Sequence, residues 1–231
     1  MSTTLETFDL AETPLRALNQ RLHDLAGTRG AHVRVTNPSG AHAVACGIDA
    51  EMDVEIDGHV GYYCAGMNKH ATVRVHGNAG SGLAENMMSG RVVVDGSASQ
   101  YCGATAHGGL IVVHGDTSLR CGISLKGGEI VVRGSVGGNS MFMAQAGALV
   151  VCGDAGEALG DSLYEARIYV RGSVAGLGAD CVEKELRDEH AAELRDLLAR
   201  AGMTDADPSE FRRYGSARRL YNFHRDNAGE Y

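Results

Sequence analysis

Glycine recurs every 19 residues through the middle of the sequence. Seven glycines hold this spacing, and each ends a five-residue phrase such as Val54-Glu-Ile-Asp-Gly58 or Ile130-Val-Val-Arg-Gly134. The seven are Gly58, Gly77, Gly96, Gly115, Gly134, Gly153 and Gly172. A fixed short period is typical of a solenoid, in which each repeat buries its apolar edge against its neighbours. The spacing therefore predicts one continuous coil, with any functional residues on its surface.

The residues four and two positions before each of these glycines are always Val, Ile or Leu. A strand directs alternate side chains to one face, so both positions are expected to point into the coil. At about 3.3 Å per residue, one repeat can close a roughly triangular turn with three short strands and glycine corners. Stacked turns would pair as parallel strands. We therefore predict an all-β fold, a right-handed parallel β-helix, whose handedness follows the general crossover rule.

Three regions are expected: an N-terminal cap over residues 1–32, the coil over 33–180, and a C-terminal region over 181–231. In the first, Thr13 is expected to cap a helix opened by Pro14, with Leu15, Leu18, Leu22 and Leu25 on one face. In the third, residues 182–201 predict a helix that Gly202 ends. Solenoid ends expose strand edges, so covering the coil is the expected task of both helices.

Composition excludes several broad classes of protein. The net charge of −8 argues against a general nucleic-acid binder. The sequence contains no apolar run long enough to cross a bilayer and no N-terminal secretion signal, so we expect no membrane association. Six cysteines without such a signal are expected to be reduced thiols, which favours a cytoplasmic protein.

Two columns of stacked residues contain metal-ligand side chains. Six positions after the repeat glycine lie Cys64, Leu83, Cys102, Cys121, Ser140 and Leu159. Because the column mixes Cys with Leu and its cysteines form no Cys-x-x-Cys pair, we interpret it as buried core rather than a zinc or iron–sulfur site. One position before the glycine, His76, Asp95 and His114 are outward-facing. The two histidines are two turns apart, about 9–10 Å, so no metal site is predicted there.

A third column is apolar on the outer face. Three positions before the glycine, Glu55 and Arg74 are followed by Val93, Val112, Val131, Val150 and Tyr169. An apolar strip of this size is not expected to stay in water. Either the C-terminal helix covers it, or it is a docking face for another subunit; the sequence leaves both open.

The C-terminal tail combines aromatic residues with arginine. Residues 211–231 contain Phe211, Tyr214, Tyr221, Phe223 and Tyr231 together with five arginines. This composition is typical of protein interfaces, so the first four aromatics are candidate interface residues. A tail that wraps its own coil, or an RNA-binding arm, are the alternatives.

Motifs for catalysis or cofactor binding are absent from the sequence. It contains no phosphate-binding lysine loop, no G-x-S-x-G and no H-E-x-x-H. Its glycine clusters belong to the repeat. We therefore predict no catalytic, cofactor-binding or metal-binding residue in this chain.

The repeats resemble the GXGXG domain that ends the large subunit of glutamate synthase. Residues 115–132, GDTSLRCGISLKGGEIVV, resemble that domain's Gly-Asp-Ala-Asn-Asp-Tyr-Val-Gly-Lys-Gly-Leu-Ser-Gly-Gly-x-Ile phrase, and residues 134–151, GSVGGNSMFMAQAGALVV, resemble its following turn. The resemblance covers most of residues 33–180. Arg120 and Cys121 depart from it where the family favours Tyr-Val, which we interpret as a core substitution.

Together with its two ends, the chain resembles the small β-helix subunit of N-methylglutamate synthase and related glutamate-synthase-like complexes. The resemblance implies a non-catalytic subunit of an enzyme complex. Its implied partners are a class II glutamine-amidotransferase-like subunit and a subunit that carries FMN and an iron–sulfur cluster. The complex would move methylamine onto glutamate, or ammonia onto a 2-oxo acid.

Two alternatives belong to other classes. The C subunit of formylmethanofuran dehydrogenase shares the repeat and would imply a molybdenum or tungsten complex. A stand-alone acyltransferase of the hexapeptide type would have a left-handed coil built from six-residue units, and this sequence has no six-residue period.

Overall fold

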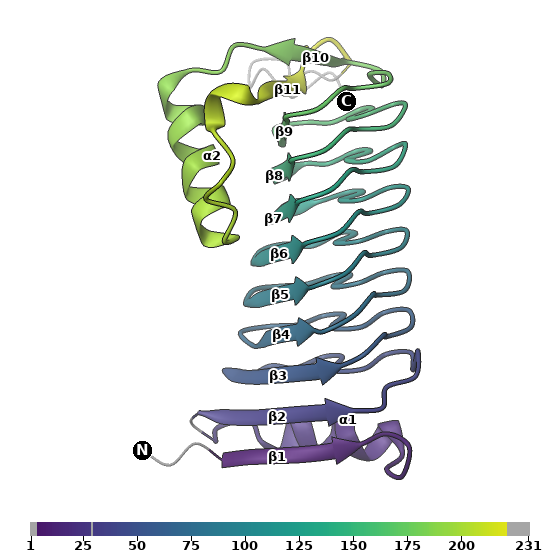
Figure 1. Ribbon diagram of the computed structural model, residues 1–231. Helices are drawn as coiled ribbons and strands as arrows, with labels where there is room; N and C mark the ends of the chain where they lie inside the picture. Colours follow the sequence, from purple (N-terminus) through teal and green to yellow (C-terminus); the bar gives the residue numbers. More distant parts are fainter. Residues whose placement is uncertain (1–3, 29, 221–231) are drawn as a thin grey trace, which may run out of the picture.

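The strands stack one above another into a tall coil (Figure 1). The computed structural model describes residues 4–28 and 30–220. Over these residues the strands are β1 (Thr4–Asp9), β2 (Ala31–Thr36), β3 (Met52–Asp57), β4 (Thr72–Val75), β5 (Arg91–Val94), β6 (Leu110–Val113), β7 (Lys126–Val132), β8 (Ala146–Val151), β9 (Arg167–Val170), β10 (Cys181–Lys184) and β11 (Arg212–Ser216). They form one sheet in the order β1 to β9, then β11 and β10.

The register of the sheet repeats the sequence period. Val73 lies opposite Val92, Val92 opposite Ile111, and Ile111 opposite Ile130, all in parallel pairs. These side chains are at most 1% exposed, which confirms that the positions four before the glycine fill the interior. The chain runs forward along each strand and returns behind it while rising, so the coil is right-handed (Figure 1). A left-handed acyltransferase coil is therefore the wrong alternative.

Each turn of the coil contains one strand rather than the three expected. The second side has only a single bridge per turn, two residues after the repeat glycine, as between Ala79 and Ala98. The third side replaces a strand with alternating left-handed residues, for example Ala84 and Asn86 at φ 53° and 57°. Their N–H groups donate in opposite directions along the coil, Ala84 to Cys64 O at 2.8 Å and Asn86 to Ala104 O at 2.9 Å. This backbone bends sharply while still bonding both neighbouring turns.

The repeat glycines stack in direct backbone contact. The N–H of Gly153 donates to the carbonyl of Gly134 at 2.9 Å, and the N–H of Gly134 donates to that of Gly115 at 3.0 Å. A Cβ added to Gly153 would lie 2.7 Å from the carbonyl carbon and oxygen of Gly134. The period therefore requires glycine because the next turn leaves no room for a side chain.

A ladder of short polar residues lies beside the glycines, one position later in each turn. Its members are Asn78, Ser97, Asp116, Ser135, Asp154 and Ser173. The side-chain oxygen of each of the first five accepts the backbone N–H of the next member, one turn above, as from Ser97 N–H to Asn78 Oδ1 at 2.8 Å and from Asp154 N–H to Ser135 Oγ at 3.0 Å. These hydrogen bonds satisfy backbone donors at the corner, where the strand pairing has ended.

Helix α1 (Leu15–Asp24) covers the first turns, with Leu18 and Leu22 fully buried in the coil's core. The expected cap is wrong, because Pro14 occupies the N-cap position and no side chain bonds the helix start. Before the helix, β1 pairs in parallel with β2 and extends the sheet by one strand. Nothing in the glycine period indicated that strand.

The C-terminal helix is shorter than expected. Residues 181–184 form β10, and helix α2 occupies Asp188–Arg200. Gly202 follows at φ 74°, as expected for a residue that ends a helix. Strand β11 lies between β9 and β10 and is antiparallel to both, so this pair of strands closes the last edge of the coil.

Candidate functional site

The outward apolar strip lies beneath α2. Val93 is 5% exposed, and the other four residues of the strip are fully buried. They form one apolar cluster with Leu194, Leu197 and Leu198 of the helix. The sequence left two possible covers for the strip, the C-terminal helix and another subunit; in this chain the helix lies on that face (Figure 1).

Ion pairs border this apolar contact. Glu193 of α2 accepts three hydrogen bonds from Arg167, the shortest at 2.7 Å, and another from the hydroxyl of Tyr169. Burial raises the pKa of Tyr169, and the nearby Glu193 carboxylate raises it further. Farther along the helix, Arg200 pairs with Glu129 on β7 at 2.7 Å. The helix is therefore fixed by a buried apolar stripe with charges at its rim.

The aromatic tail residues have separate positions. Phe211 is 4% exposed and belongs to the cluster under α2, while Tyr214 is 2% exposed and packs into the main core. Tyr221 and Phe223 lie outside the described residues. In this single chain the strip, Phe211 and Tyr214 are inaccessible, so contact between them and a partner subunit stays a prediction that requires α2 or the tail to move.

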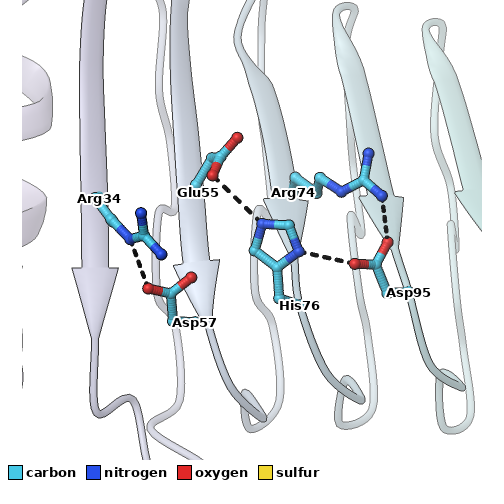
Figure 2. Close-up of polar contacts among 6 residues, drawn as sticks. All are labelled: Arg34, Glu55, Asp57, Arg74, His76 and Asp95. Atoms are coloured by element: carbon cyan, nitrogen blue, oxygen red, sulfur yellow. Dashed lines mark hydrogen bonds and ion pairs between the residues drawn. The ribbon is translucent and has the colours of Figure 1, made fainter.

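Toward the N-terminal end of the coil, the same outer face is charged. Figure 2 shows six of these side chains, on β2 to β5 or just after their ends. They are Arg34, Glu55, Asp57, Arg74, His76 and Asp95. Arg34 Nε donates to Asp57 Oδ2 at 2.6 Å. His76 lies between two carboxylates, with Nδ1 2.8 Å from Asp95 Oδ2 and Nε2 3.4 Å from Glu55 Oε2.

Charge alternates along this ladder from strand to strand. Asp95 also accepts a hydrogen bond from Arg74 at 2.7 Å. Burial alone would raise the pKa of Asp95, but the hydrogen bonds from His76 and Arg74 outweigh it and lower that pKa. All six side chains are 28–52% exposed, and exposed ion pairs contribute little to stability. The ladder therefore contributes little to the stability of the coil, and its main feature is a pattern of charge on the surface.

Metal binding finds no support on this face. His114, the second histidine of the column, lies two turns from His76, and burial lowers its pKa. Across the residues that the structure describes, no group of three or more His, Cys, Asp or Glu side chains is arranged to hold a metal ion.

The cysteine column lies inside the coil, as expected. Cys64, Cys102 and Cys121 are each fully buried beside Leu83 and Leu159. The hydrogen bond with Cys121 and burial both raise the pKa of the Cys102 thiol. The prediction that Arg120 and Cys121 are a core substitution is therefore confirmed for Cys121. It is wrong for Arg120, which is exposed and donates to the hydroxyl of Tyr101 at 3.0 Å.

Burial predicts slow chemistry at these thiols. Cys102 and Cys121 should react with iodoacetamide at least about a hundredfold more slowly in the folded chain than in urea, because labelling requires the coil to open. The half-buried Cys46 is the internal control and should be labelled before them in the folded protein. Peptide mass spectrometry over a time course measures all three rates. Rapid labelling of Cys102 and Cys121 without unfolding would contradict a closed coil interior.

Comparison with known proteins gives one extensive match. The chain is 61% identical over 228 residues to Protein GlxC of Rhizobium meliloti (strain 1021), which covers 98% of this chain and 100% of that protein. No family model matches the chain. Neither α1 nor α2, the helices of the described part, is long and apolar enough to span a bilayer. Since an identity of this level over nearly the whole length shows common family membership, the chain belongs to the family of Protein GlxC.

Proposed function

We propose that this chain is the non-catalytic β-helix subunit of a glutamate-synthase-type complex. The observation that carries the proposal is the position of the two segments that resemble the GXGXG phrases. Residues 115–132 and 134–151 form consecutive turns of one right-handed coil, and each ends in a strand of the parallel sheet, β7 and β8. The glycine spacing on which the resemblance rests therefore builds one continuous three-dimensional unit in this chain.

A holding role suits the physical character of the coil. Its interior is filled by stacked apolar side chains from α1 to the last turn. Each turn is hydrogen-bonded to the turns above and below through strands, glycines and the polar ladder. Such a body keeps its surface groups at fixed separations, which is what a subunit needs in order to hold two enzymes in one geometry.

The surface also carries side chains suited to protein contact. Tyr62, Met67, Met88, Leu119 and Met143 are 39–54% exposed on the turns of the coil. Methionine adapts its shape to a partner, and exposed apolar groups gain free energy when a partner covers them. The charged ladder on β2 to β5 adds a pattern that can select one partner over another.

Within this proposal, the complex is an N-methylglutamate synthase. It converts methylamine and glutamate to N-methylglutamate and ammonia. A class II glutamine-amidotransferase-like subunit and a subunit with FMN and an iron–sulfur cluster carry the chemistry, and this chain holds them together in the cytoplasm. Support for this finer assignment comes from the resemblance of the repeats and of the chain ends.

The proposal predicts a difference between the chain alone and the chain with its partners. Purified alone, the chain should be colourless, without flavin or iron, and without activity. Tagged and isolated from its native host, it should bring down two further chains in fixed stoichiometry, with a flavin absorption spectrum. The preparation should form N-methylglutamate from methylamine and glutamate, as followed by mass spectrometry.

Several results would overturn parts of this proposal. Stoichiometric flavin or iron in the isolated chain would contradict the non-catalytic role. Partners that contain molybdenum or tungsten would favour the formylmethanofuran dehydrogenase alternative. Formation of glutamate from 2-oxoglutarate and ammonia, without N-methylglutamate, would keep the complex type and reject the product.

A further inference from the structure

A basic cleft lies at the C-terminal end of the coil, away from the charged ladder. It has a volume of about 370 Å³ and is bounded by the start of β9, by β10 and β11, and by the first turn of α2. Five cationic side chains line it: Arg167, Lys184, Arg187, Arg213 and Arg218. Only two carboxylates, Glu165 and Glu189, share that lining. An excess of positive charge at one place is unexpected on a chain with a net charge of −8.

Carboxylates neutralise three of the five cations. Arg167 is held by Glu193, Arg218 pairs with Glu165 at 2.9 Å, and Arg187 pairs with Glu185 at 3.2 Å. The other two form no salt bridge with a described residue, although the Glu189 carboxylate of the lining attracts Arg213. Lys184 makes no ion pair there, and Arg213 donates its Nε to the backbone carbonyl of Glu185 at 2.8 Å. Lys184 and Arg213 are therefore the two cations of the cleft that have no salt-bridge partner in the described structure and can pair with a ligand.

The surroundings of Arg213 show the strength of that positive field. Burial lowers the pKa of Arg213, and the charges of Arg187 and Arg167 lower it further, against opposing contributions from Tyr169 and Glu189. Burial also lowers the pKa of His190, and Arg213 adds to that effect. Neutral His190 accepts the backbone N–H of Arg187 at Nδ1, so its proton is on Nε2 and its ring is an additional donor in the cleft lining.

We propose that this cleft binds a small oxyanion with two negative charges, whose charged groups are carboxylates or phosphate, through Lys184 and Arg213. Lys184 and Arg213, the two cations without a salt bridge, are the groups that would pair with its charges. The guanidinium fork of Arg213 matches the two oxygens of a carboxylate or phosphate, and charge-assisted hydrogen bonds of this kind are the strong ones. The volume is that of a small-molecule site rather than of a surface that follows a polymer.

This site is independent of the proposed subunit function, because binding needs only residues of this chain. Isothermal titration calorimetry on the isolated, full-length chain tests it, with inorganic phosphate in one series and 2-oxoglutarate in another. Both series are run at constant ionic strength, adjusted with sodium chloride. The proposal requires saturable binding with one site per chain in at least one series. Tighter binding of phosphate would identify a phosphate-bearing ligand, and tighter binding of 2-oxoglutarate a dicarboxylate.

Variants locate the binding. Lys184→Gln should raise the Kd by at least about tenfold, since it removes a charged hydrogen bond, and Arg213→Gln should act in the same direction. Lys126→Gln removes the same charge from an exposed lysine on β7 and should leave the Kd unchanged. If circular dichroism shows that Arg213→Gln perturbs the fold, the Kd of Lys184→Gln alone tests the site, because Lys184 forms no ion pair in the described structure. No saturable heat in either series, or equal Kd values for wild type and Lys184→Gln, would overturn the site.

Discussion

Replacement of Val131 by Asp should lower the free energy of unfolding of the isolated chain by at least about 3 kcal/mol. Val131 is fully buried between Val112 and Val150 in the sheet and beneath the leucines of α2. A carboxylate at this position would lose its hydration without gaining a designed partner, which is among the most costly single changes in a core. Urea unfolding followed by circular dichroism measures the loss.

A matched control is available at the same phase of the repeat. Arg74 also lies three positions before a repeat glycine, but on a strand that α2 leaves exposed. Arg74→Asp should cost no more than about 1 kcal/mol, because it changes only solvent-exposed charge pairs. If Val131→Asp were as mild as Arg74→Asp, α2 would not cover the strip in solution. A folded, stable Val131→Asp chain that no longer assembles with its partners would instead support a subunit face there.

The coil could be predicted from the sequence because every turn repeats the same physical problem. Position four before the glycine must be apolar and the glycine must lack a side chain, so both appear every 19 residues. The polar ladder from Asn78 to Ser173 follows the same period and could have been recognised from it. Strands β1, β10 and β11 could not be predicted, since they are outside the repeat and pair with edges that only the folded coil supplies.

The candidate site was harder to predict, for a related reason. The sequence shows that the strip from Val93 to Tyr169 is apolar, but apolar side chains do not specify what covers them. Leu194, Leu197 and Leu198 form a stripe at helical spacing, and Glu193 supplies a charge for Arg167; together they identify α2 as the cover once the fold is known. The basic cleft gave no local signal, because its cations are spread over residues 167–218: one each on β9, β10 and β11, one just before α2 and one just after β11.

Replacement of Gly153 by Ala should lower the free energy of unfolding by about 3 kcal/mol, although it adds only one methyl group. The added Cβ would lie 2.6 Å from Ser135 Oγ and 2.7 Å from the backbone of Gly134. The hydroxyl can rotate away, but the backbone of the neighbouring turn cannot, because Gly134 accepts the N–H of Gly153 and donates to Gly115. Relief of the clash requires two turns to separate and weakens the hydrogen bonds between them.

Gly215 of β11 provides the comparison that isolates this effect. Gly215 is also buried, yet an added Cβ would meet nothing closer than 3.7 Å, an ordinary contact distance. Gly215→Ala should therefore change stability by no more than about 0.5 kcal/mol, and restriction of the unfolded chain would favour a slight gain. The midpoints of urea unfolding measure the stability change in both variants, provided that the m values are unchanged. Equal midpoints for Gly153→Ala and wild type would mean that adjacent turns tolerate a side chain at the corner. The 19-residue glycine period would then need a cause other than close contact of stacked backbones.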